Sequence, residues 1–201
     1  LGWGHGDDEK FSAAQFVEWF DVGGVSHAAS RFDASKLTWL NQQYLKEADN
    51  ARLAELVHPF LKLQGIEPNT GPDPVDLIGL VKERVSTVKE LADGLHIYYR
   101  QALPAVDEVR AKLTASALPA FEKLRQDMEV MAWEAPILSQ LLKDTAAAFG
   151  LKMGQIGMPL RLVLFGTAQT PAIDQVLAIM GREETLRRFD AAWPQVKVAV
   201  E

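Results

Sequence analysis

Helical spacing of apolar residues is the feature that most limits the folds open to this sequence. Apolar side chains recur three and four positions apart in residues 34–47, 50–64 and 74–100, as they do along one face of an α-helix. Strand-like alternation is scarce, and only the run "RLVLF" at 161–165 is ambiguous. Its helical flanks decide against a strand, so we predict an all-α fold.

Capping and turn residues divide the chain further. Ser12 and Gln15 fit a capping box, Pro119 is expected to split the segment 105–130, and Gly150 is expected to end the helix before it. The stretch "LQGIEPNTGPDP" is dense in Gly, Pro and Asn, so we expect two helical subdomains joined near residues 65–73. The last third is predicted to hold three helices, over about 153–165, 171–180 and 182–192.

Composition excludes several classes of protein. The chain has no cysteine, which rules out disulfides and thiolate chemistry and fits a reducing cytosol. No apolar run approaches the roughly 20 residues that span a bilayer, and the N-terminus is acidic where a signal peptide would be basic and apolar. We expect a cytoplasmic protein without membrane contact. Leu1, in the place of an initiator methionine, predicts that the chain is part of a longer protein or lacks its first residues.

The formal net charge of −6 argues against a protein that coats nucleic acids indiscriminately. The charge is uneven, however. Residues 1–50 carry 4 basic and 8 acidic side chains, whereas residues 151–189 carry 5 basic and 3 acidic ones. A local cationic surface of this kind still attracts a polyanion.

Patterns for catalysis, a cofactor or a metal are absent from the sequence. No glycine-rich phosphate loop follows a predicted strand, and the four histidines are far apart, without a partner at metal-ligand spacing. Ser86 and Ser139 have no base beside them in sequence. We therefore predict a binding module with no catalytic residue, no cofactor and no metal.

Two arginines stand on predicted helices without an acidic residue three or four positions away. Arg84 lies at the edge of the apolar stripe of helix 74–100, and Arg161 lies inside an otherwise apolar run. A tertiary salt bridge or plain exposure would explain either one. The alternative is a guanidinium that donates paired hydrogen bonds to a planar acceptor such as a base edge or a phosphate. Thr170 and Pro171 are expected to be the N-cap and first residue of the next helix, whose free amides would receive such an oxygen.

Four segments together resemble the C-terminal half of the bacterial glutamyl-tRNA synthetases, in that family's order and spacing. They are "LGWGHGDDEKFSAAQFVEWFD", "FDASKLTWLNQQYLK", "KERVSTVKEL" and "MPLRLVLFGTAQTPAIDQVLAIMG". The similarity covers essentially the whole chain. It implies the helical anticodon-binding cage of a class I aminoacyl-tRNA synthetase.

The resemblance implies the end of the stem-contact domain over 1–65 and two anticodon-binding subdomains over 66–131 and 132–201. ATP and magnesium are implied only for the catalytic domain of the parent enzyme, whose two ATP motifs are absent here, so this fragment is expected to be non-catalytic. The implied partner is glutamate tRNA and not DNA, and a monomer is expected.

Carried over segment by segment, the resemblance implies anticodon contacts for Arg84, Arg161, Thr170 and Pro171. Trp39 and Asn41 are implied as possible contacts to the tRNA stem, although a core tryptophan and a surface asparagine explain them as well. Two alternatives stay open: a helical protein–protein interaction module, and a synthetase that charges both glutamate and glutamine tRNAs. The positions of Arg84, Arg161 and Thr170 in the fold distinguish the first alternative from RNA binding, because an RNA reader needs them on one surface.

Overall fold

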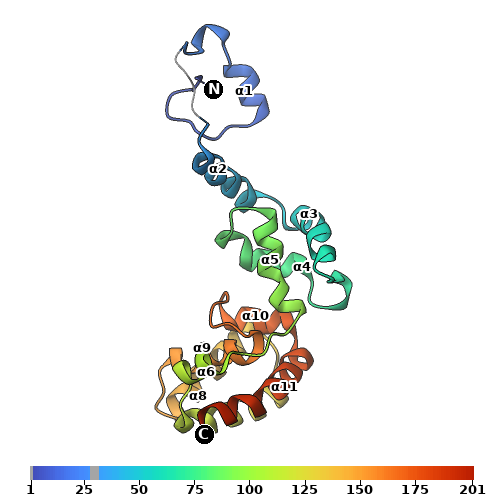
Figure 1. The fold of residues 1–201 in the computed structure, drawn as a ribbon, viewed down its shortest axis with the longest axis vertical. Helices are drawn as coiled ribbons and strands as arrows, with labels where there is room; N and C mark the ends of the chain where they lie inside the picture. Colours follow the sequence, from blue (N-terminus) through green and yellow to red (C-terminus); the bar gives the residue numbers. More distant parts are fainter. Residues whose placement is uncertain (1, 28–31) are drawn as a thin grey trace.

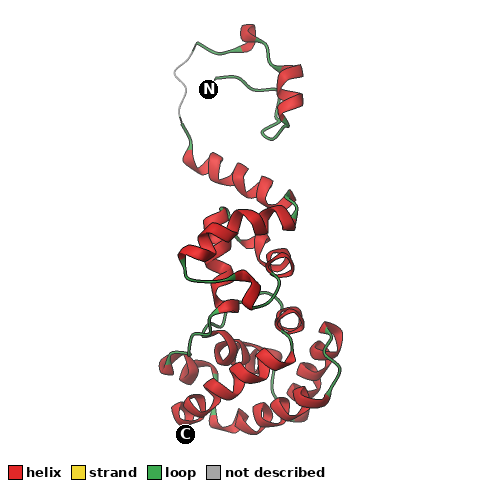
Figure 2. Ribbon diagram, turned by 90° about the vertical axis from the view of Figure 1, so that its right-hand side faces the viewer, coloured by secondary structure: helices red, strands yellow, loops and turns green. Residues whose placement is uncertain are grey.

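The computed structural model describes residues 2–27 and 32–201 as an elongated stack of helices (Figure 1). Leu1 lies outside the described residues. No strand occurs in the described part of the chain (Figure 2), which confirms the all-α prediction. The α-helices are Ala13–Trp19 (α1), Ala34–Glu47 (α2), Asn50–Leu63 (α3), Pro74–Val81 (α4), Val88–Tyr99 (α5), Val106–Lys112 (α6), Leu118–Val130 (α7), Ala135–Ala148 (α8), Met153–Phe165 (α9), Ile173–Met180 (α10) and Arg182–Val200 (α11).

The N-terminal part is the least buried region. The capping box of α1 is confirmed, because the Ser12 hydroxyl accepts from the Gln15 amide and the Gln15 side chain accepts from the Ser12 amide. No residue of α1 is buried, and the Trp3 ring instead contacts Phe11 and Phe16 edge-on. This part is held together by a small aromatic cluster and not by a helical core.

In the middle of the molecule, α3, α4 and α5 pack against one another (Figure 1). The stretch 64–73 folds back onto this group: Arg100 donates to the Gly65 carbonyl at 2.6 Å and the Tyr99 hydroxyl to the Pro72 carbonyl at 2.9 Å. Helices α3 and α5 pack against each other, although they lie on opposite sides of the predicted boundary at residue 65. The assignment of the three ranges to named domains stays a prediction.

The prediction of a single helix over 74–100 is wrong, because the chain forms two helices there, α4 and α5, with a break between them. Residues Lys82–Arg84 form a 3-10 turn, after which Val85 is extended. A second capping arrangement then starts α5: the Thr87 hydroxyl accepts from the Glu90 amide and the Glu90 carboxylate accepts from the Ser86 amide. Arg84 thus lies in a turn and not on the side of a long helix.

The C-terminal half consists of α6 to α11, whose buried apolar residues belong to the same core cluster as those of α3, α4 and α5. Pro119 falls in the first turn of α7, so the predicted split of 105–130 is confirmed. Gly150 follows α8 with φ of +65°, as predicted for a helix end. The last helix is longer than predicted and runs to Val200, because the buried residues of α11 continue at helical spacing to Ala199.

Candidate functional site

The loop between α9 and α10 differs from the prediction. Ala172, and not Thr170, occupies the N-cap position of α10, the helix begins at Ile173, and no side chain caps it. The Thr170 hydroxyl is instead buried, donates to the Pro171 carbonyl at 3.0 Å and accepts a hydrogen bond from Arg161. The assignment of Thr170 and Pro171 to the helix start is therefore wrong, because the hydroxyl that would cap the helix is used inside the loop.

Both unpaired arginines converge on that loop. Arg84 Nη1 donates to the Thr170 carbonyl at 3.1 Å, and Arg161 Nε donates to the Thr170 hydroxyl at 2.8 Å. Arg161 Nη2 also donates to the Pro171 carbonyl at 3.3 Å. The structure thus brings together four residues named from the sequence, from segments separated by up to 86 positions.

Neither arginine forms an ion pair within the described parts of the chain. Burial lowers the pKa of Arg161, the positive charge of Arg84 lowers it further, and the negative charge of Asp174 offsets part of this. Two like charges close together without a carboxylate in contact leave a local positive potential.

Tyr98 is a buried residue of α5 that interacts electrostatically with both arginines and was not singled out from the sequence. Its ring is 1% exposed, and burial raises its pKa to about 12, against the opposing influence of the positive charges of Arg84 and Arg161. The phenol therefore stays protonated at neutral pH. A signal was available, because Tyr98 continues the apolar spacing of Leu91 and Leu95 on α5.

Trp39 and Asn41 lie on α2, which packs against the turn that carries Arg84. The Asn41 side-chain amide donates to the Ser86 carbonyl, so it fixes the backbone just after Arg84. Trp39 is 41% exposed, so it is not a core tryptophan. Their role in binding tRNA stays a prediction.

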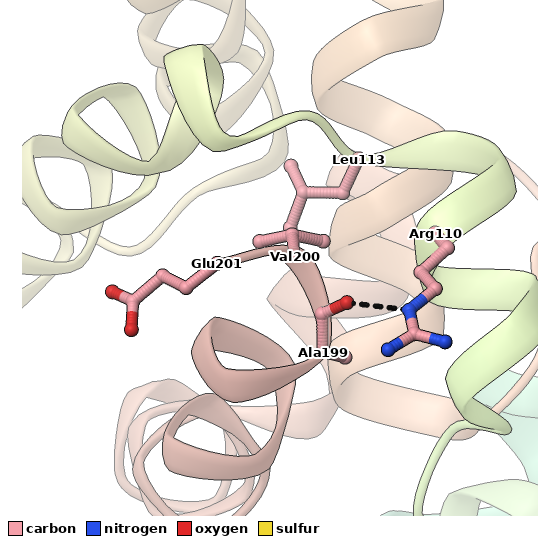
Figure 3. A pocket seen from close by; sticks show the side chains of 5 residues that line it. All are labelled: Arg110, Leu113, Ala199, Val200 and Glu201. Carbon is pink, nitrogen blue, oxygen red and sulfur yellow. Dashed lines mark hydrogen bonds between the residues drawn. The ribbon is translucent and has the colours of Figure 1, made fainter.

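A pocket at the C-terminus of the described chain contains none of the predicted site residues (Figure 3). It has a volume of about 310 Å³ and is lined by Arg110, Leu113, Ala199, Val200 and Glu201. Arg110 Nε donates to the Ala199 carbonyl at 2.8 Å, so its charged group is engaged with the end of α11.

Within residues 2–27 and 32–201, no three His, Cys, Asp or Glu side chains lie close enough together to hold a metal ion. In the same residues, every helix falls short of the length and apolar character needed to traverse a bilayer.

The described part of the chain is thus an all-helical module in which two arginines from different groups of helices donate to one loop. The sequence model of a family described as "Anticodon binding domain" matches residues 52–193, which is more than half of the chain. The chain therefore belongs to the anticodon binding domain family.

Similar proteins point to one kind of parent. A glutamate–tRNA ligase of Nitrosospira multiformis is 48% identical over 193 residues, which cover 94% of this chain and 41% of the ligase. That of Thiobacillus denitrificans is 45% identical, with 96% and 41% covered. The crystal structure of a glutamate tRNA ligase from Elizabethkingia meningosepticum in complex with its amino acid superposes with a TM-score of 0.88 at 27% identity, covering 98% of this chain and 39% of that one. The resemblance seen in the sequence is confirmed, and the chain spans about two fifths of the length of these relatives.

Proposed function

We propose that this chain is the anticodon-reading part of a glutamate–tRNA ligase and that it binds glutamate tRNA. The parent enzyme would join glutamate to this tRNA at the expense of ATP, with the ATP, magnesium and glutamate sites outside the 201 residues. We further propose a cytoplasmic monomer that does not bind DNA. The ranges 1–65, 66–131 and 132–201 are proposed as the end of the stem-contact domain and two anticodon-binding subdomains.

The convergence of Arg84 and Arg161 on Thr170 carries the proposal. Arg84 comes from the middle group of helices and Arg161 from the C-terminal group, yet both donate to the same residue. A scaffold module whose apolar stripes serve packing alone has no need of two adjacent arginines that lack a carboxylate. Proteins read RNA sequence chiefly on single-stranded loops with splayed bases, and the guanidinium fork suits their edges.

Base chemistry explains how such a pair would select a glutamate anticodon. The third anticodon base is cytosine in glutamate tRNA and guanine in glutamine tRNA. The Watson–Crick edge of cytosine offers the acceptors O2 and N3 to an arginine, whereas guanine presents N–H donors there. A desolvated donor facing a donor costs about 1–3 kcal/mol, equivalent to roughly 5- to 150-fold in affinity.

The test is a titration with two anticodon stem-loops that differ only in the third anticodon base, cytosine or guanine. We expect the chain to prefer the cytosine loop, and we expect Arg84→Gln to remove most of that preference. Arg187→Gln is the matched control, because Arg187 is an exposed arginine already neutralised by Glu184. The same measurement on Arg161→Gln assigns the share of the second arginine.

The outcomes separate the alternatives. Equal affinity of the unaltered chain for the two loops would favour a ligase that charges both glutamate and glutamine tRNAs. Absence of binding to either loop would favour a protein–protein interaction module. A preference that survives Arg84→Gln would contradict the assigned role of Arg84.

A further inference from the structure

Arg188 on α11 is an almost fully buried arginine that the proposed reading site does not contain. Its side chain is 1% exposed, and it is among the largest fully buried side chains of the described residues. Burying a guanidinium is costly unless every donor is paired, so the surroundings of Arg188 must supply acceptors.

Those acceptors come from three different helices. Within α11, Arg188 Nε donates to the Glu184 carboxylate at 2.6 Å. The remaining bonds leave the helix: they go to the carbonyl oxygens of Ile97 at 2.7 Å, Tyr98 at 2.5 Å and Leu164 at 3.4 Å. Ile97 and Tyr98 lie in the last turn of α5, and Leu164 lies in the last turn of α9.

The last carbonyls of a helix lack partners within the helix and carry its partial negative charge. A single guanidinium thus caps the C-terminal ends of α5 and α9 together. Side-chain packing reinforces the junction, since Arg188 lies 5.6 Å from the centre of the Phe165 ring and the Tyr98 ring meets Phe165 edge-on at 5.5 Å. Gln101 adds a hydrogen bond of 2.8 Å to the Arg188 carbonyl.

Both ends held by Arg188 support the Arg84–Arg161 site. Helix α5 begins at Val88, four residues after Arg84, at the end opposite the one that Arg188 caps. On α9, the capped turn is the point from which the loop to Thr170 departs, one residue after Phe165. The two groups of helices that supply Arg84 and Arg161 therefore meet where the Arg188 guanidinium joins them.

We propose that Arg188, held by Glu184, is a positioning residue that fixes the placement of Arg84 relative to Arg161 and thereby sets the selectivity for the third anticodon base. This inference rests on the proposed function. Arg188 touches no base and contributes through α5 and α9 alone. Its influence falls on the ratio of affinities for two RNAs, because a shift of one arginine relative to the other misplaces donors for the correct base.

Arg188→Lys tests the proposal with the charge retained. A lysine ammonium keeps a positive charge near Glu184 but lacks the planar fork that reaches carbonyls on two helices. Arg187→Lys is the matched control, since Arg187 adjoins Arg188, bonds the same Glu184 and is 58% exposed. Thermal unfolding shows at which temperature both variants are folded, and all binding is measured below it.

Two readouts are taken. The first is the ratio of dissociation constants for the cytosine and guanine stem-loops, which we expect Arg188→Lys to reduce about fivefold or more and Arg187→Lys to leave unchanged. The second is the distance between spin labels on cysteines introduced at the exposed residues Lys62 and Gln175, which is practical because the chain has no cysteine of its own. We expect this distance distribution to shift or broaden in Arg188→Lys only.

An unchanged affinity ratio together with an unchanged distance distribution in folded Arg188→Lys would overturn the proposal. Equal weakening of both RNAs with the ratio preserved would overturn it as well. If Arg188→Lys does not fold, Glu184→Gln replaces it, because that change leaves Arg188 in place and removes its carboxylate. A native chain without any preference would refute the proposed function, whereas the spin-label distances would still report whether Arg188 fixes the junction.

Discussion

Two pairs of arginines in this molecule are built in opposite ways. Arg187 and Arg188 share the carboxylate of Glu184, which is 32% exposed, and only Arg188 is buried. Arg84 and Arg161 share Thr170, which offers a carbonyl and a hydroxyl but no negative charge. The first pair is held by a counter-ion, whereas the second pair is held in place and left positively charged.

The difference suggests that the Arg187–Arg188 pair serves the stability of the fold, whereas the Arg84–Arg161 pair serves the proposed recognition of RNA. A buried guanidinium with a carboxylate and three carbonyls has its donors committed to the fold. The Arg84–Arg161 pair has neutral acceptors only, so its charge remains available to an external group. The same substitution is therefore expected to change the free energy of unfolding when it is made at Arg188, and to change mainly the proposed RNA binding when it is made at Arg84 or Arg161.

The largest expected effect is on the free energy of unfolding of Arg188→Met. Losing Arg188 leaves the carbonyls of α5 and α9 without their donor, and each buried acceptor left unsatisfied costs about 1–3 kcal/mol, so a total loss of about 3 kcal/mol or more is expected. Arg161→Met removes hydrogen bonds to neutral acceptors and relieves repulsion with Arg84, so a loss of at most about 1.5 kcal/mol is expected. Urea denaturation of both variants measures the two losses of unfolding free energy. Similar losses would contradict the expected difference between Arg188 and Arg161.

A smaller effect is expected at the glycine that lets α9 approach the segment after α5. Gly166 has φ of +69°, and a Cβ there would lie 2.8 Å from the Ala102 carbonyl oxygen. Gly150 has φ of +65°, and a Cβ added there would have no neighbour within 4 Å, so it is the control for backbone strain alone. We expect Gly166→Ala to lower the free energy of unfolding by about 1–3 kcal/mol more than Gly150→Ala does, as urea denaturation would measure. Equal losses of unfolding free energy in the two variants would show that the contact between Gly166 and Ala102 can adjust to an added Cβ without strain.

The stability contributed by the Glu184 carboxylate is expected to depend on pH. Hydrogen bonds from Arg187 and Arg188 lower the pKa of Glu184 to about 2, Arg187 making the larger contribution, while burial opposes the shift. A carboxyl with a lowered pKa stabilises the fold fully above its unfolded value of 4.5, and this stability is lost as the pH falls toward 2. The difference in unfolding free energy between the native chain and Glu184→Gln should therefore be constant above about pH 5 and shrink below it. A constant difference down to the pKa of about 2 would argue against the ion pair.

The smallest effect is expected for Arg187→Met. Arg187 is 58% exposed and bonds only the neighbouring turn of its own helix, and pairs of this kind contribute about 0–1 kcal/mol. Urea denaturation beside Arg188→Met gives the comparison directly, because the two residues adjoin and share Glu184. A loss approaching that of Arg188→Met would mean that the cluster acts as one unit.

Much of the fold could be predicted from the sequence because amphipathic spacing and caps are local signals. Residues 34–47 form α2 with the expected bounds, and 153–165 form α9. The break after α4 was missed because the apolar stripe of 74–100 runs through it without a proline or glycine at the break. Thr87 and Glu90 have the spacing of a capping box at the start of α5, so a local signal for this helix start existed. The longer apolar stripe of 74–100 competed with it.

The residues of the candidate site could be singled out from the sequence, but their arrangement in space could not. The absence of acidic neighbours singled out Arg84 and Arg161, but only the tertiary fold shows that both donate to Thr170. The N-cap assignment of Thr170 failed because a hydroxyl that can cap a helix can equally accept from an arginine nine positions earlier. Arg188 gave a signal that was not used: it stands three residues after Thr185 and four before Ala192, on the buried stripe of α11.

Thr170 has a further consequence for the energetics of binding. Ordering a free arginine side chain costs up to about 2 kcal/mol of rotamer entropy. Because Arg84 and Arg161 are already hydrogen-bonded to Thr170, most of that entropy is lost on folding and not in the proposed binding of RNA. An incoming base would find two forks of fixed orientation, so a correct edge gains affinity without an ordering penalty, and an incorrect edge meets donors that do not rotate away.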